Sequence, residues 1–155
     1  MSKNSKSERN NFVDLRHAAR DSGYHDVIAD ILDIKKCPFC PENFKWHKKP
    51  TLAKERGWFI TENTWPYENA KHHFLIIPKK HIVTIDDVSD EDFNAVKKLT
   101  RVVSEKHNIT GGGLTLRFGD STFTGSTVTH LHFHLIVPEL ERGEKNAKPV
   151  YFPIG

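Results

Sequence analysis

Residues 129–138 alternate polar and apolar side chains in the way expected of a half-buried strand. His130, His132 and His134 occupy alternate positions, and an apolar residue follows each of them. Because successive side chains of a strand point to opposite faces, the three imidazoles share one face and the intervening residues face a core. The predicted core residues are Leu131, Phe133, Leu135 and Val137. The alternation therefore predicts a strand over residues 130–138 that carries three histidines on one surface.

The other periodicities predict an α+β domain with a largely antiparallel sheet. Apolar residues at helical spacing predict a short helix over residues 24–34. A longer helix is expected from the capping Ser89 to about residue 108, because apolar side chains then follow at spacings of three and four. Short apolar or alternating runs predict further strands at residues 58–60, 73–77 and 114–118. Helix, strands, helix and strands in this order favour an α+β fold.

Length and charge limit the number of domains and the classes of partner. A chain of 155 residues with 37% hydrophobic and 28% charged residues can form one globular core. We expect residues 23–155 to form this domain and residues 1–22 to be a polar N-terminal extension that is partly disordered. The net charge is only +3 and the basic and acidic residues are interspersed, which argues against a partner such as duplex nucleic acid.

The sequence contains no segment suited to a membrane or to secretion. No apolar run approaches the roughly 20 residues that cross a bilayer, and no stretch at the start resembles a secretory signal. We therefore expect a cytoplasmic protein without a membrane partner. The only two cysteines, Cys37 and Cys40, are spaced as Cys-Pro-Phe-Cys. Inside a cell, this spacing indicates metal or redox chemistry more often than a structural disulfide.

Residues 130–136 match the signature His-φ-His-φ-His-φ-φ, where φ denotes an apolar residue, at every position. With this motif the chain resembles the histidine triad family. Residues 119–128, rich in glycine and hydroxyl side chains, resemble the phosphate-facing loop of the family, and residues 73–81 resemble its strand ending in Pro-Lys-x-His. The similarity extends over residues 37–138. It implies a sheet of about five strands with a long helix packed on it.

The resemblance implies that the middle histidine, His132, attacks the α-phosphorus of a nucleotide. A neutral imidazole has a lone pair and an ordinary pKa of about 6.5, so much of it is ready to react near neutral pH. The product would be a covalent nucleotidyl-histidine, which water or another acceptor then resolves. His134 is expected to contact phosphate oxygens. The loop residues expected to bind the substrate or stabilise its charge are Gly125, Ser126 and Thr127, with Thr127 also assisting the leaving group.

Two loop positions differ from the form that many hydrolases of the family have. Gly119 stands where they carry Asn and Ser126 where they carry Gln, so the contacts of those amides are absent. The Gly and Ser form, like residues 63–66, resembles the nucleotidyltransferase branch and the branch of dinucleoside polyphosphate hydrolases and phosphorylases. We expect Asn63 to touch ribose or phosphate. The alternative is an Asn that bonds its own backbone in a turn.

The resemblance also suggests which ligands accompany the two cysteines. Tetrahedral zinc takes four ligands, so two thiolates need two more, for which imidazoles are suited. The positions that match zinc-binding family members are His81 and His130. Such a site has no open place for water, and its thiolates cancel the charge of the ion. Zinc bound by Cys37, Cys40, His81 and His130 would therefore be structural.

Two other classes of function are compatible with the histidines. His130, His132 and His134 could hold a catalytic metal in a metal-dependent hydrolase, because His-x-His on a strand serves such sites. The chain could also be a nucleotide-binding module with little catalysis. Family resemblance favours a nucleotide hydrolase or nucleotidyltransferase that takes a purine nucleotide and forms a homodimer.

Overall fold

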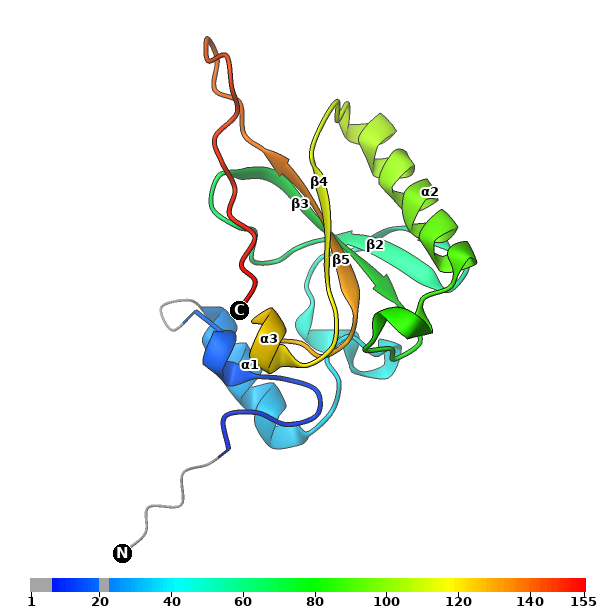
Figure 1. The fold of residues 1–155 in the computed structure, drawn as a ribbon, viewed down its shortest axis with the longest axis vertical. Coiled ribbons are helices and arrows are strands. Elements are labelled where there is room, and N and C mark those ends of the chain that lie inside the picture. The colour runs from blue at the N-terminus through cyan, green and yellow to red at the C-terminus, as the bar shows by residue number, and fades with distance from the viewer. Residues whose placement is uncertain (1–6, 20–22) are drawn as a thin grey trace, which may run out of the picture.

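The structure is a computed structural model and describes residues 7–19 and 23–155 (Figure 1). Its centre is one five-stranded sheet in the order β1-β2-β3-β5-β4, with every neighbouring pair antiparallel. The strands are β1 (Thr51–Glu55), β2 (Trp58–Glu62), β3 (Ala70–Pro78), β4 (Gly113–Arg117) and β5 (His132–Pro138). The predicted α+β fold with an antiparallel sheet of about five strands is confirmed.

Strand β1 is the strand that local sequence patterns did not predict. It lies at one edge of the sheet, and its side chains are exposed or half-buried. A bulge between Thr51 and Ala53 interrupts its pairing with β2. Because neither face of the strand is fully buried, no regular alternation of apolar residues marks it.

Helix α2 (Asp90–His107) begins and ends as its sequence predicts. The hydroxyl of Ser89 accepts a hydrogen bond from the N–H of Asp92, whose carboxylate accepts one from the N–H of Ser89. This reciprocal pair is a capping box. At the other end, Asn108 adopts a left-handed conformation with φ of 52°, which Asn tolerates better than most residues. The two caps fix the length of the helix that covers the sheet.

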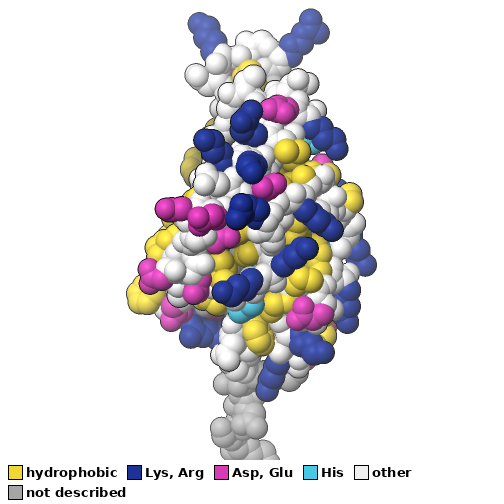
Figure 2. Space-filling model, turned by 90° about the vertical axis from the view of Figure 1, so that its right-hand side faces the viewer, with side chains coloured by type: hydrophobic (Ala, Val, Ile, Leu, Met, Phe, Trp, Pro, Cys, Tyr) yellow, Lys and Arg dark blue, Asp and Glu magenta, His cyan; other side chains and the backbone are white. Residues whose placement is uncertain are grey.

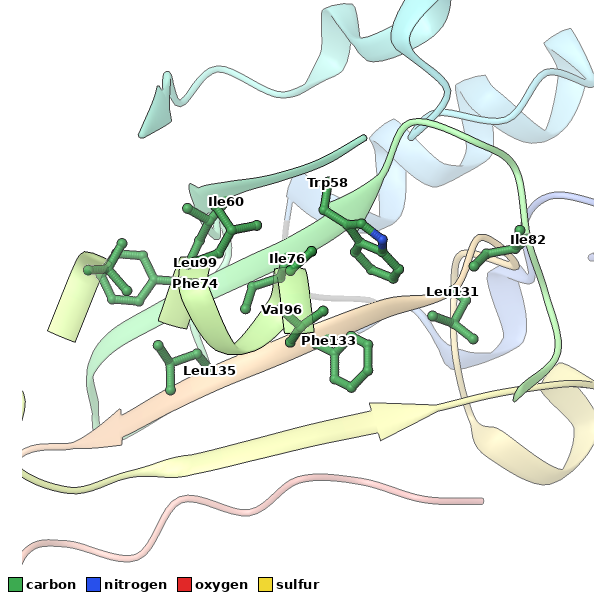
Figure 3. Packing of buried hydrophobic residues seen from close by; sticks show 12 residues of the cluster. Trp58, Ile60, Phe74, Ile76, Ile82, Val96, Leu99, Leu131, Phe133 and Leu135 are labelled. Atoms are coloured by element: carbon green, nitrogen blue, oxygen red, sulfur yellow. The ribbon is translucent and has the colours of Figure 1, made fainter. Parts of the chain in front are cut away.

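The main core lies between α2 and one face of the sheet (Figure 3). Val96 and Leu99 of α2 pack against aromatic and aliphatic side chains of three adjacent strands. The strand residues are Trp58, Ile60, Phe74, Ile76, Phe133 and Leu135. Burying each such side chain contributes roughly 1.5–3 kcal/mol relative to leaving it exposed. This layer therefore holds β5, the strand with the triad motif, firmly in the middle of the sheet.

The opposite face of the sheet is covered by chain that precedes β1. Phe59, Leu75 and Ile77 are buried there, with Phe39 and Phe44 packed over them. Helix α1 (Gly23–Ile34), which confirms the helix predicted over residues 24–34, packs beside this layer (Figure 1). The short helical segments of the molecule are η1 (Leu15–His17), η2 (Pro41–Trp46), η3 (Ile85–Asp87) and α3 (Ser121–Thr124). The face with His132 and His134 lies on this side.

Part of the segment predicted to be a polar N-terminal extension packs against the domain. Val13 is fully buried and pairs with Val128 through a β-bridge, and the N–H of Asp14 donates to the carbonyl of Thr127. The buried carboxylate of Asp14 also accepts a hydrogen bond from Ser121. Residues 7–18 thus support the loop before the triad. Residues 1–6 and 20–22, which belong to the same predicted extension, lie outside the described residues.

Strand β5 begins at His132, two residues later than predicted. The N–H of Leu131 bonds to the carbonyl of Ile82, which draws the chain away from the sheet before His132 pairs with Arg117. His130 therefore lies just outside the strand, although it is fully buried. The first histidine of the motif is separated from the other two by this change of direction.

The surface beside α2 carries both signs of charge. On the face in Figure 2, Lys and Arg side chains are interspersed with Asp and Glu side chains, so the basic residues do not form a separate patch. The prediction that duplex nucleic acid is not a partner stays a prediction. Among the described residues, no helix has the length and apolar character to cross a membrane. Residues 139–149, which are mostly polar, contain no helix or strand.

Candidate functional site

A pocket of about 560 Å³ opens on the face of the sheet opposite α2. His132 and His134 line it, together with Asn63, Gly125 and Thr127. All five residues were predicted from the sequence to belong to the site, and the fold brings them to one cavity. Its volume lies within the range of roughly 300–1,000 Å³ that is usual for small-molecule sites.

His132 is oriented by the backbone of its own motif. Its Nδ1 lies 2.6 Å from the carbonyl oxygen of His130, so Nδ1 carries the proton and donates it. The lone pair of the neutral ring is then on Nε2. Burial, assisted by the nearby charge of Arg117, lowers the pKa of His132 to about 3. The imidazole is therefore neutral at pH 7 and keeps that lone pair.

His134 is oriented by a chain of hydrogen bonds from β3 and the turn before it. The N–H of Tyr67 donates to His73 Nδ1 over 3.1 Å, so the proton of that ring is on Nε2. His73 Nε2 in turn lies 2.8 Å from His134 Nδ1 and donates to it. His134 consequently carries its proton on Nε2. Burial lowers the pKa of His73 to about 4 and that of His134 well below its ordinary value, so both rings are neutral.

Arg117 is a site residue that the sequence analysis missed. It ends β4 opposite His132, and it is the only Lys or Arg among the described residues that line the pocket. One guanidinium nitrogen, Nη2, lies 3.2 Å from the Tyr67 hydroxyl and 3.4 Å from His134 Nε2. Alternation along residues 114–118 marked Arg117 as facing away from the core. Only the pairing of β4 with β5 shows that this direction leads into the pocket.

The segment 151–155, which the sequence analysis left without a role, lies against the same pocket. The ring of Phe152 stands edge-on to His134 at 5.1 Å between centroids, and the Arg117 guanidinium lies 4.7 Å over it. The carbonyl of Pro153 accepts a hydrogen bond from Arg117 Nη1. The end of the described chain lies beside α3 (Figure 1), where a Cβ on Gly125 would clash with the backbone of Gly155. Phe152 and Pro153 thereby fix the position of Arg117.

The loop before the triad places its predicted residues differently. Gly125 has φ of 66°, a left-handed conformation that glycine adopts without strain, and ends α3. Thr127 lines the pocket and shares a hydrogen bond with the hydroxyl of Tyr24. The hydroxyl of Ser126 instead donates to the carbonyl of Val128, and its N–H donates to Thr124. The geometry gives no support to a substrate contact by the Ser126 side chain.

Asn63 makes the turn hydrogen bond that was the alternative prediction, and it also lies at the pocket where a substrate contact was predicted. Its side-chain oxygen accepts a hydrogen bond from the N–H of Trp65, as in an Asx turn. Its amide nitrogen lies 3.3 Å from His73 Nδ1 and helps to orient the relay of Tyr67, His73 and His134. Asn63 also lines the pocket, and a contact with substrate stays a prediction.

A second constellation lies at the start of the triad motif and contains every predicted metal ligand. One ligand atom from each of Cys37, Cys40, His81 and His130 lies within 4.8 Å of the others. The Nδ1 atom of His130 is 3.3 Å from the sulfur of Cys37 and 3.8 Å from that of Cys40. Two thiols and two imidazoles match the ligand types of a closed tetrahedral zinc site.

The hydrogen bond that His130 makes outside the cluster also suits a metal ligand. Nε2 of His130 donates to the carbonyl of Pro78 over 2.8 Å, which leaves the lone pair of Nδ1 directed at the thiols. Burial raises the pKa of both thiols, that of Cys37 to about 12, so the two cysteines by themselves favour the protonated form at neutral pH. A bound cation would stabilise the thiolate forms.

The structure does not favour the alternative of a catalytic metal held by the triad. Among the described residues, no group of three or more potential ligands includes His132 or His134. The ring of His130 faces the cysteines, and Nδ1 of His132 is occupied by a carbonyl. The three histidines therefore do not converge on one point.

Similarity to known proteins agrees with this geometry. Residues 36–148 match the family model described as scavenger mRNA decapping enzyme C-term binding. The chain is 29% identical over 108 residues to a bis(5'-adenosyl)-triphosphatase of Dictyostelium discoideum, an alignment that covers 64% of this chain and 70% of that protein. It is 32% identical over 119 residues to an adenosine 5'-monophosphoramidase of Danio rerio, with 73% and 71% covered.

A solved HIT family hydrolase from Clostridium thermocellum has the same fold. The TM-score is 0.52 at 25% identity, and the match covers 72% of this chain and 96% of that one. HIT stands for histidine triad, and both named relatives in the preceding comparison are enzymes that act on nucleotides. On its motif, its fold and these similarities, the chain belongs to the histidine triad family.

Proposed function

We propose that the chain is a nucleotide hydrolase or nucleotidyltransferase that forms a covalent nucleotidyl-histidine on His132. One observation carries the proposal: the neutral ring of His132 bonds the backbone through Nδ1 and lines a pocket of about 560 Å³. A buried nucleophile with its lone pair already oriented needs no deprotonation before it attacks. The enzymatic character of the named relatives supports the same reading.

In the first step, the lone pair of His132 Nε2 forms a bond to the α-phosphorus, and the bond from phosphorus to the leaving group breaks. The His132 ring becomes positively charged, because Nδ1 keeps its proton. The carbonyl of His130, 2.6 Å from that proton, stabilises the charge. The N–H of His134 Nε2 can donate a hydrogen bond to the leaving group or to a phosphate oxygen as negative charge develops there, and it keeps its proton. Thr127 supports this charge from the loop side.

In the second step, an acceptor breaks the bond between nitrogen and phosphorus. Water gives a nucleoside monophosphate and a proton, whereas phosphate or another nucleophile gives a transferred nucleotide. In either case His132 returns to its neutral form. Trp65 and Tyr24, whose rings lie 4.8 Å apart at the wall of the pocket, offer apolar surface to a base. A purine nucleotide is the proposed substrate, and a homodimer is the expected assembly by family resemblance.

The proposal includes a structural zinc ion held by Cys37, Cys40, His81 and His130. Bound zinc would cross-link the turn before η2 to the start of the triad motif, and it would have no open position for substrate. In this arrangement, His130 contributes its side chain to the cluster and its carbonyl to His132. The metal would therefore support the position of the nucleophile.

A trapping experiment tests the covalent step. Diadenosine triphosphate labelled at its α-phosphorus is mixed with the protein, and the reaction is stopped with base, which preserves a phosphohistidine-type linkage. We expect protein-bound label that acid releases, and no label on His132→Asn. Turnover of this variant should fall by about 10⁴-fold or more.

The matched control is His72→Asn. His72 belongs to β3 and is not among the described residues that line the pocket of His132 and His134. It should trap label like the wild type. Steady turnover by the wild type without any bound label, together with undiminished turnover by His132→Asn, would refute the covalent mechanism. Release of metal by His132→Asn would instead revive the catalytic-metal alternative.

A further inference from the structure

Arg117 brings a positive charge without a counter-ion to the edge of the proposed reaction centre. Its partners are a hydroxyl, a backbone carbonyl and an aromatic ring, contributed by Tyr67, Pro153 and Phe152. Among the described residues, no carboxylate pairs with Arg117. Its Nε atom is buried, and no described residue accepts a hydrogen bond from it. Arg117 is half-buried, and buried donors are normally satisfied, so this guanidinium is free to bind an anionic group in the pocket.

The neighbouring imidazole points a second donor to the same place. The relay from Tyr67 through His73 leaves the proton of His134 on Nε2, which is 3.4 Å from Arg117 Nη2. Two N–H groups at this separation cannot satisfy each other. They can both be satisfied by one anionic oxygen between or above them, and an arginine matches phosphate oxygens well.

The position of this donor pair suits the leaving side of the reaction. Reacting atoms approach to about 3–3.5 Å before attack, so the departing atom of an in-line displacement stands about 5 Å from the nucleophile. His134 follows His132 by two strand positions, roughly 6.5 Å along β5, and the rings are 4.7 Å apart between centroids. Arg117 reaches the far ring through Nη2. A group beyond the α-phosphorus can therefore lie within its reach.

We propose that Arg117 and the Nε2–H of His134 form a subsite for a phosphate of the leaving group. The proposal rests on the function proposed above and defines its substrate class more narrowly. Preferred substrates carry a phosphate chain beyond the α-phosphorus, as nucleoside polyphosphates and dinucleoside polyphosphates do. Phosphoramidates with a neutral amine as leaving group leave the guanidinium without its acceptor.

Ligand binding tests the subsite independently of turnover. The probes are AMP and α,β-methylene-ADP, which differ by a second phosphate on a bridge that cannot be hydrolysed. We expect the wild type to bind the methylene compound about tenfold or more tighter than AMP. Arg117→Gln should reduce this ratio to about threefold or less while its affinity for AMP changes little. An equal loss for both ligands would overturn the proposal, because Arg117 would then serve the α-phosphate or the fold alone.

Turnover separates failure of the subsite from failure of the proposed function. Arg117→Gln should lower kcat/KM for diadenosine triphosphate about tenfold more than for adenosine 5'-phosphoramidate. If the wild type turns over both compounds and the variant loses them equally, the subsite is overturned and the nucleotide chemistry stands. If the wild type turns over neither but shows the binding ratio, the subsite stands and the proposed chemistry is overturned.

Two further variants control for folding and charge. Arg117→Lys keeps the charge without the planar fork, so it should recover part of the binding ratio even if the Gln variant is poorly folded. Arg101→Gln removes an exposed arginine of α2 and should leave the ratio unchanged. A Lys variant that melts like the wild type but has no residual preference for the second phosphate would count against the subsite.

Discussion

His130 and His132 are separated by one residue, yet their rings are held in opposite ways. Nε2 of His130 donates to the carbonyl of Pro78, so its Nδ1 lone pair is directed at two cysteine sulfurs. His132 donates from Nδ1 to the carbonyl of His130, so its Nε2 lone pair is available to the pocket. One backbone carbonyl in each case decides which nitrogen can act as a ligand or a nucleophile.

The difference teaches that a repeated residue type need not form one site. His130 lies before the first residue of β5, where the chain bends to bond Ile82, whereas His132 and His134 lie within the strand. The bend separates a closed cluster suited to metal from an open pocket suited to chemistry. A substitution in the metal cluster should therefore leave the reactive histidines of the pocket in place, and a substitution in the pocket should leave the metal ligands in place.

The largest expected effect comes from breaking the cluster. Cys40→Ser removes one of four ligands, so bound zinc should be lost, with destabilisation of about 5 kcal/mol or more. For a chain of this length, that corresponds to a melting temperature lower by roughly 10–20 °C. Turnover per folded molecule, measured well below melting, should stay within about tenfold of the wild type because His132 keeps its own hydrogen bond.

Metal analysis and calorimetry on the same preparation measure this prediction. His72→Asn serves as the control that should keep both metal and melting temperature. Retention of a full equivalent of zinc by Cys40→Ser would show that the four residues are not the ligand set. A loss of turnover as complete as that of His132→Asn would show that the two regions are not separable.

A smaller effect is expected from breaking the relay on the pocket side. His73→Leu removes the donor to His134 Nδ1, so the His134 ring can adopt either tautomer and is no longer held with its proton on Nε2. We expect kcat to fall by about 10- to 100-fold with little change in KM. His73→Gln, whose amide can still donate, should recover part of the loss. If both variants were equally impaired, or KM alone rose, His73 would have a packing role instead of a positioning one.

The sequence predicted what repeats regularly and missed what depends on distant pairing. The caps of α2 and the alternation of β5 are local signals, and both elements are present, although β5 begins at His132, two residues later than the alternation predicted. The ligand set of Cys37, Cys40, His81 and His130 was proposed from the family resemblance, and the fold brings these four residues together.

The omissions have a common physical cause. Arg117 enters the pocket only because β4 pairs with β5 in a register that sets it opposite His132, and no local pattern encodes that register. Phe152 contacts His134 through a segment without helix or strand, so no periodicity marks it. Ser126, by contrast, was predicted from its place in the loop; its hydroxyl donates to the carbonyl of Val128, and a contact with substrate stays a prediction.

The smallest expected effect concerns pH and again distinguishes the two regions. Burial lowers the pKa of His73 to about 4 in the folded protein, whereas the unfolded chain has the ordinary value of about 6.5. As pH falls from 7 to 5.5, the unfolded state therefore binds a proton that the folded state does not, and the free energy of unfolding falls by roughly 1 kcal/mol on account of this residue. Between pH 7 and 5.5, the free energy of unfolding of His73→Leu should therefore fall by that much less than the free energy of unfolding of the wild type. Denaturant titrations of both proteins at equal zinc concentration measure it, because acid release of the metal then cancels in the difference. Parallel curves for the two proteins would mean that the His73 ring is as easily protonated in the fold as outside it, and the neutral relay to His134 would have to be abandoned.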